Sequence, residues 1–148
     1  MLVSPFRPFT MTTSAQEPQS QASPEMTPYE RLGGQEAVEQ LTQKFYQLMD
    51  SDMAYQALRA VHGPDLVRAQ ERLFWFLSGW LGGPALYQEK VGHPMLRARH
   101  LPFKIGILER NQWLLCMHQA MTELDVEESF KDQLIQSFFK TADWMRNT

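Results

Sequence analysis

The sequence predicts an all-α protein, and three observations support this. From residue 29 onward, apolar residues recur at spacings of three and four, which is the period of one face of a helix. No run of alternating β-branched residues indicates a strand. The chain has 148 residues, of which 43% are hydrophobic and 21% charged, so it has room for one core of ordinary size. We therefore expect a single helical domain over residues 29–148.

Residues 1–28 differ in composition from the rest of the chain. They contain five of the nine prolines, no glycine and many Ser, Thr and Gln residues. A segment of this kind cannot bury enough apolar surface to fold. Pro5, Arg7 and Pro8 interrupt its only hydrophobic cluster, which argues against a secretory signal. We expect a disordered extension here.

The first long helix is expected after a turn at Gly33 and Gly34. Its apolar stripe consists of Val38, Leu41, Phe45, Leu48 and Met49. A short helical piece over 54–61 should follow, and Asp65 is placed to cap the next helix. That helix, over 66–81, is apolar on nearly every side, which predicts deep burial.

The segment 87–102 is the least regular, with a short helix expected between Pro94 and Pro102. Proline disfavours the helical conformation of the residue before it, so the helix should end at His100, just before Leu101. Pro102 is then expected to open a long helix. A last helix should begin at a capping box formed by Asp125 and Glu128.

Composition excludes several classes of protein. A net charge of −3 lacks the basic footprint of a nucleic-acid-binding protein, and no apolar run reaches the length of a membrane span. Cys116 is the only cysteine, so an intrachain disulfide and a four-thiolate site are both impossible, and a reducing, cytoplasmic location fits best. Its apolar neighbours predict a buried, unreactive thiol. Phosphate-binding glycine loops, zinc-protease motifs and serine-hydrolase elbows are not indicated.

His100 is the most informative polar residue of the body. A histidine at a helix end is usually a cap or a surface residue. Here Arg97 and Arg99 precede it within one turn, so one short helix offers an imidazole ligand and two cations suited to carboxylates. Haem needs this combination, because its iron takes an axial nitrogen and its propionates are acidic.

The body of the chain resembles the group II truncated haemoglobins, which are shortened globins with a two-over-two helical sandwich around a haem. The resemblance covers nearly all of residues 29–148. The matching segments are 29–34, 45–46, 81–84 with Tyr87, 92–103, and 109–110 with Trp113 and 116–118. The glycine pair in 81–84 and the block 92–103 are specific in combination.

On the proximal side, the resemblance implies that His100 is the ligand of the haem iron. Arg99 and Tyr87 match positions that reach the haem propionates. The resemblance further assigns to the haem pocket Ala69, Leu73, Phe76, Leu77 and Phe103. His93 and His118 match no ligand position and are expected to be structural or surface residues.

On the distal side, Tyr46 and Trp113 match the pair that donates hydrogen bonds to a bound ligand, and His62 matches a third distal position. Periodicity alone favours a different interpretation, in which Tyr46 and Trp113 are core aromatics whose polar tips find backbone partners. His62 could also close the sixth coordination position of the iron.

The resemblance implies a haem b protein that binds oxygen, nitric oxide or carbon monoxide at ferrous iron. Several distal donors should slow ligand release, which favours nitric oxide or peroxide detoxification, or sensing, over oxygen transport or storage. No flavin or nicotinamide site is visible, so a separate reductase is expected as partner. Two alternatives remain open: a haem peroxidase assisted by Tyr46 and Trp113, and a haem-free globin-shaped interaction module.

Overall fold

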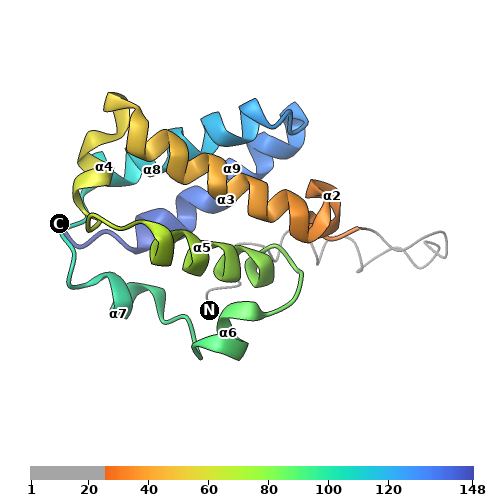
Figure 1. The fold of residues 1–148 in the computed structure, drawn as a ribbon, viewed down its shortest axis with the longest axis horizontal. Helices are drawn as coiled ribbons and strands as arrows, with labels where there is room; N and C mark the ends of the chain where they lie inside the picture. The colour runs from red at the N-terminus through yellow and green to blue at the C-terminus, as the bar shows by residue number, and fades with distance from the viewer. Residues whose placement is uncertain (1–25) are drawn as a thin grey trace.

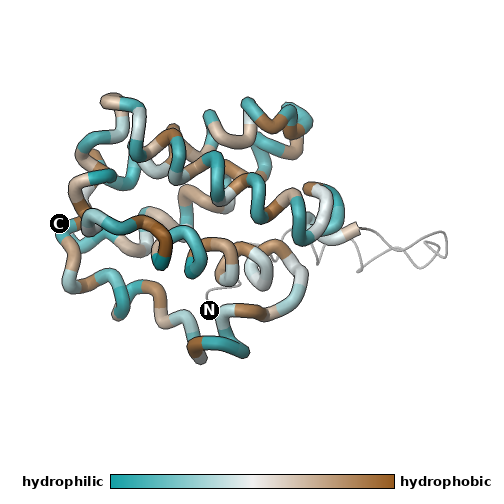
Figure 2. Tube along the Cα trace, in the orientation of Figure 1, coloured by the Kyte–Doolittle hydropathy of each residue, from teal (hydrophilic) through white to brown (hydrophobic). Residues whose placement is uncertain are grey.

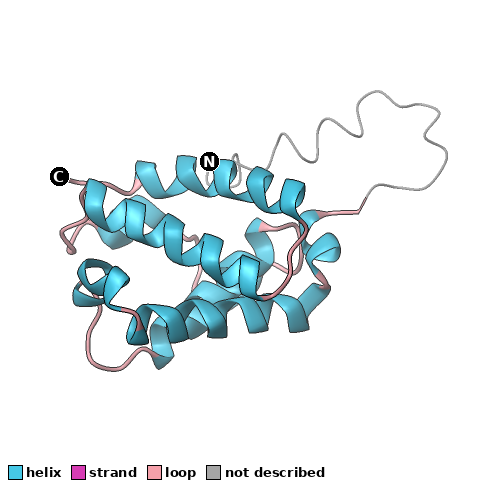
Figure 3. Cartoon of the chain, turned by 90° about the horizontal axis from the view of Figure 1, so that it is seen from above, coloured by secondary structure: helices cyan, strands magenta, loops and turns pink. Residues whose placement is uncertain are grey.

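The computed structural model describes residues 26–148, and every regular element within that part of the chain is helical (Figures 1 and 3). The prediction of an all-α fold is therefore confirmed. The elements are α2 Pro28–Leu32, α3 Gly34–Ser51, the 3-10 helix η3 Met53–Tyr55, α4 Gln56–Ala60, α5 Val67–Trp80, α6 Leu86–Lys90, α7 Leu96–His100, α8 Ile107–Glu123 and α9 Glu128–Trp144. None of these helices is both long and apolar enough to span a membrane.

The start of the described chain is fixed by a capping box. The Thr27 hydroxyl accepts a hydrogen bond from the Glu30 amide at 3.1 Å, and the Glu30 carboxylate accepts one from the Thr27 amide at 3.0 Å. Pro28 occupies the first helical position, where its missing N–H costs nothing. The extension predicted for residues 1–28 lies almost wholly outside the described residues, since these begin at residue 26.

Two packed helix pairs make up the body of the domain. α3 packs against α5, α8 packs against α9, and α3 also crosses α8, which joins the two pairs into one core. The side chains that close this core completely include Leu41, Phe45, Met49, Leu77, Met117 and Leu134. In Figure 1, α7 stands apart from these layers, across from α5.

Two predicted helix starts are wrong. The long helix α8 begins at Ile107 rather than at Pro102, because Gly106 precedes it and donates its amide to the Glu109 carboxylate at 2.8 Å. The capping box predicted at Asp125 does not form, since this residue adopts a left-handed conformation with φ of 60° and α9 starts after Glu127.

The prediction that α5 is deeply buried is also wrong. Only Leu77, Ser78 and Trp80 of this helix are buried, whereas Leu73 and Phe76 remain partly exposed. The reason is that part of the apolar surface of α5 faces a cavity instead of another helix.

Candidate functional site

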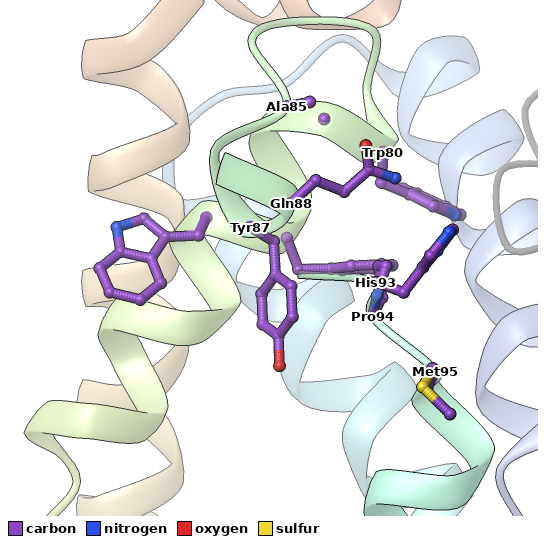
Figure 4. Close-up of a pocket in the computed structure, with 10 residues that line it drawn as sticks. Trp80, Ala85, Tyr87, Gln88, His93, Pro94 and Met95 are labelled. Atoms are coloured by element: carbon purple, nitrogen blue, oxygen red, sulfur yellow. The ribbon is translucent and has the colours of Figure 1, made fainter. Parts of the chain in front are cut away.

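A cavity of about 460 Å³ opens between α5, α6 and the segment that leads into α7 (Figure 4). It is lined by Trp75, Phe76, Gly79, Trp80, Ala85, Tyr87, Gln88, His93, Pro94 and Met95. Phe76 and Tyr87 were both expected to contact a cofactor. His93, expected to be structural or on the surface, lines the same cavity, as do Trp75 and Trp80 of α5.

Large apolar side chains stand exposed on both sides of His100. Met95, Leu101, Phe103 and Ile107 are each exposed by about half. Figure 2 shows brown, apolar positions along α5, which lies across from α7 in Figure 1. The partly exposed apolar residues of α5 include Ala69, Leu73 and Phe76. Exposed apolar side chains gathered around one histidine suit a large apolar ligand, because water is a poor environment for them. Leu77, also assigned to the pocket, is fully buried in the core.

His100 is the last residue of α7, and one of its ring nitrogens is already committed. Nδ1 lies 2.7 Å from the carbonyl oxygen of Leu96. A carbonyl can only accept, so Nδ1 carries the proton and the neutral ring keeps the lone pair on Nε2. An axial histidine needs this arrangement, with one nitrogen oriented by an acceptor and the other free for metal.

The two arginines of α7 have separate partners. Nη1 of Arg97 donates to the carbonyls of Trp144 and Arg146, at 2.6 and 2.8 Å, so this cation holds the chain end rather than standing free beside His100. Arg99 donates to the carbonyls of Pro94 and His93, at 2.7 and 3.1 Å. Its guanidinium also lies 5.7 Å from the centre of the Tyr87 ring, so the two residues expected at the propionates do meet.

Of the three residues expected on the distal side, Tyr46 and His62 lie together, and Phe45 links Tyr46 to Trp113. Tyr46 comes from α3, His62 from the end of α4 and Trp113 from α8. The ring centres of Tyr46 and His62 are 5.8 Å apart. Phe45 joins the group, with its ring centre 5.0 Å from Tyr46 and 5.3 Å from Trp113.

Tyr46 and Trp113 have polar tips without a protein acceptor. The Tyr46 side chain is only 7% exposed, yet its hydroxyl makes no hydrogen bond with any residue that the structure describes, and the same is true of the Trp113 indole N–H. Burial raises the pKa of Tyr46, and nearby Cys116 adds to the shift, so the hydroxyl keeps its proton. Neither donor atom is among the fully buried polar atoms that lack a partner in the described part of the chain, so each has open space beside it that an acceptor of a ligand can take.

His62 differs from these two donors. Its Nδ1 lies 3.0 Å from the Leu58 carbonyl and must therefore carry the proton. Burial lowers the pKa of His62 and outweighs the hydrogen bond to Leu58, which raises it; the positive charge of Arg59 lowers the pKa further, which favours the neutral ring. Neutral His62 thus presents an acceptor nitrogen, Nε2, rather than a third donor.

Comparisons with known proteins decide the family. The model for bacterial-like globins matches residues 27–147. This chain is a bacterial-like globin. It is 39% identical over 120 residues to a group 2 truncated haemoglobin of Bacillus subtilis, covering 81% of this chain and 88% of that protein.

Solved structures place this globin among the group II truncated haemoglobins. The group II two-on-two haemoglobin of Agrobacterium tumefaciens is 40% identical with a TM-score of 0.81, over 85% of this chain and 98% of that one. The cold-adapted truncated haemoglobin of Pseudoalteromonas haloplanktis is 41% identical with a TM-score of 0.80, over 83% and 99% of the two chains. Membership implies haem as cofactor and diatomic gases as ligands.

The site residues fit that cofactor. The globin offers one imidazole with a free Nε2, two unpartnered donors and half-exposed apolar walls. Within residues 26–148 no group of three His, Cys, Asp or Glu side chains could hold a metal ion directly.

Cys116 is a core residue, as expected. It is fully buried and donates to the Phe45 carbonyl at 3.3 Å, and burial raises the pKa of its thiol to about 12.

The globin also has a residue in contact with the site that sequence reasoning missed. Asn147 donates from Nδ2 to the carbonyls of His100 and Phe103, at 3.3 and 2.7 Å. Its Oδ1 accepts from the Ile105 amide at 2.9 Å, and its own amide donates to the Ile105 carbonyl at 2.9 Å. No periodicity marks a polar residue one position from the chain end, so only its position after an amphipathic helix could have drawn attention to it.

Proposed function

We propose that this globin holds haem b through Nε2 of His100 and binds oxygen, nitric oxide or carbon monoxide for redox chemistry or sensing. The observation that carries the proposal is the free Nε2 of His100, fixed by the Leu96 carbonyl, together with the unpartnered Tyr46 hydroxyl. Haem, when bound, supplies an iron that in its ferrous state takes up a diatomic gas as a further ligand.

The proximal and edge residues hold the group in this proposal. His100 supplies the nitrogen ligand, and Leu96 orients its ring. Arg99, beside Tyr87 at the cavity edge, keeps donor capacity beyond its two bonds to carbonyls, which suits an acidic propionate. Apolar side chains of α5 exclude water from the face of the ring system.

The distal residues set how long a ligand stays. Tyr46 and Trp113 can each donate to a ligand that has gained negative charge. A charge-assisted hydrogen bond in a dry site contributes about 1.5 to 3 kcal/mol, or roughly ten- to more than a hundredfold in escape rate. The Bacillus subtilis relative of known structure, 38% identical, is itself described as oxygen-avid. Slow release favours consumption of the ligand over transport or storage.

Consumption of the ligand requires a source of electrons. If oxygen bound at ferrous iron were converted with nitric oxide into nitrate, the iron would be left ferric. A separate reductase would then have to supply one electron to restore the ferrous state. We therefore propose a cytoplasmic location, beside such donors, and a role in nitric oxide or peroxide detoxification.

The visible spectrum of the purified protein tests the proposal. We expect a strong Soret band that shifts on reduction and shifts again to a stable form in oxygen. His100→Ala should lose haem while its circular dichroism remains helical, and His118→Ala, a histidine of α8 outside the site, should keep it. Normal haem content in His100→Ala contradicts the proposal.

Two other spectra would indicate different functions. Absence of a Soret band in the unchanged protein would favour the alternative of a haem-free interaction module. Low-spin spectra in both redox states would indicate that His62 closes the sixth coordination position of the iron.

A further inference from the structure

Positive charges in this globin are paired in one part of the chain and unpaired in another. Of the 14 Lys and Arg residues, all but Arg7 lie within the described part of the chain. Six of them form ion pairs with carboxylates: Arg31, Lys44, Arg59, Arg110, Lys131 and Arg146. Those without a carboxylate within 4.0 Å, among described residues, are Arg68, Arg72, Lys90, Arg97, Arg99, Lys104 and Lys140. All of these except Lys140 lie in the segment 66–104, which carries the cavity and His100.

Four of the unpaired cations form a continuous strip. Arg68, Arg72 and Trp75 follow one another at helical spacing and share one face of α5. The Lys90 ammonium, from α6, lies 5.4 Å from the centre of the Trp75 ring and continues the strip. Tyr87 precedes Lys90 by one turn of α6.

The strip ends at α7, where the Arg99 guanidinium lies 5.7 Å from the Tyr87 ring. We name these four cations, Arg68, Arg72, Lys90 and Arg99, the basic rim. The two aromatic residues between them, Trp75 and Tyr87, both line the cavity, and Figure 4 shows Tyr87 beside it. The rim therefore borders the opening of the site where the cofactor is proposed to lie.

We infer that the basic rim is the docking surface for an acidic protein that donates single electrons to this globin. The inference rests on the proposed function, because it names the partner that the redox cycle requires. One electron leaves the partner's redox centre, which is oxidised, and reduces the ferric iron to ferrous; no proton or atom moves with it. Opposite charges raise the rate of such encounters by roughly 10- to 1,000-fold at low ionic strength.

The composition of the rim favours a protein over a nucleic acid or an anionic membrane. Asp65, Glu71 and Glu89 lie in the same stretch without an ion pair, and they would repel a continuous array of phosphates. A protein surface can instead place cations opposite these three carboxylates. Electron-transfer complexes are also small and short-lived, which suits a strip of this size.

Reduction of the haem-loaded ferric globin by a purified acidic [2Fe–2S] ferredoxin tests the inference. Stopped-flow rates would be measured from about 20 mM to about 300 mM salt, where screening removes the attraction. Lys90→Glu and, separately, Arg72→Glu should slow reduction about tenfold at low salt and have little effect at high salt. Lys140→Glu is the matched control, since it makes the same change in net charge at an unpaired, exposed cation of α9, and it should change the rate less than about twofold.

Two further measurements separate the possible results. Calorimetric titration with oxidised ferredoxin should show weaker binding to both rim variants, and a small uncharged photoreductant should reduce all variants at one rate. Equal slowing by Lys140→Glu, no dependence on salt, or tighter rim-dependent binding to duplex DNA or to anionic vesicles would each overturn the inference. Failure of the unchanged protein to take up haem would instead contradict the proposed function, while the ferredoxin titration would still decide whether the rim binds this partner.

Discussion

The side chain of Asn147 donates a hydrogen bond to the carbonyl of His100 at 3.3 Å, which ties the end of the chain to the proposed iron ligand. The same amide reaches the Phe103 carbonyl, and Arg97 binds two carbonyls at the end of α9. A helix of five residues such as α7 is too short to be stable alone. We conclude that Asn147 and the end of α9 hold α7 in position.

Asn147→Ala should therefore loosen His100, the proposed iron ligand. Two lost hydrogen bonds at about 0.5 to 1.5 kcal/mol each predict haem loss faster by about tenfold, measured by transfer to an excess of apomyoglobin. We also expect a broadened or shifted iron–histidine stretching band in the resonance Raman spectrum of the ferrous protein. Asn147→Asp, which keeps the acceptor for Ile105 but loses the donor to His100, should behave similarly.

Lys131→Met is the control for general loss of stability. The buried Lys131 ammonium donates to the Thr122 hydroxyl at 2.9 Å, where the end of α8 meets α9, and nothing links it to α7. This variant should unfold more easily yet keep the iron–histidine band unchanged. An unchanged band in both Asn147 variants would show that the contact contributes only to folding.

Trp113→Phe should speed oxygen dissociation by about tenfold or more, because the indole N–H has no acceptor in the described protein and is free to hold the ligand. Tyr46→Phe should act in the same direction. Stopped-flow displacement of oxygen by carbon monoxide measures the rate. Trp144→Phe removes an indole from the exposed surface of α9 and should leave the rate as it is. A rate unaffected by Trp113→Phe would make this residue part of the core only.

Local signals predicted much of this fold. The apolar stripe of α3 and the end of α7 before Pro102 follow from spacing and from the conformational limits of proline, and both need only neighbouring residues. The start of α8 could not be predicted, because the segment before it is held by Asn147, over forty residues later. The free Nε2 of His62 could not be predicted either, because it depends on which carbonyl the ring contacts in the folded chain.

Acidification should destabilise the protein through His62. Burial lowers the pKa of His62 in the folded state below its ordinary value of 6.5, so the unfolded chain binds the proton more readily. Above pH 6.5 the contribution of neutral His62 to the free energy of unfolding is fully present. This free energy should fall as the pH drops through 6.5 toward the pKa of His62 in the folded state. His62→Gln should show a smaller fall between pH 7.5 and pH 5 in urea titrations of the apoprotein. An identical slope in both proteins would assign the acid sensitivity to other groups.

Gly83→Ala should destabilise the fold where α2 closes over the end of α5. A Cβ at Gly83 would clash with the Tyr29 ring, and the backbone here is fixed by the Tyr29 amide, which donates to the Leu81 carbonyl at 2.9 Å. Overpacking of this kind costs about 1 to 3 kcal/mol, which urea unfolding can resolve. Gly63→Ala is the matched control, since nothing lies within 4 Å of its Cβ, and its effect should stay within about 0.5 kcal/mol. Combining Gly83→Ala with Tyr29→Ala should cost less than the sum of the single changes, because the smaller side chain removes the clash; full additivity would show that the ring moves aside without strain.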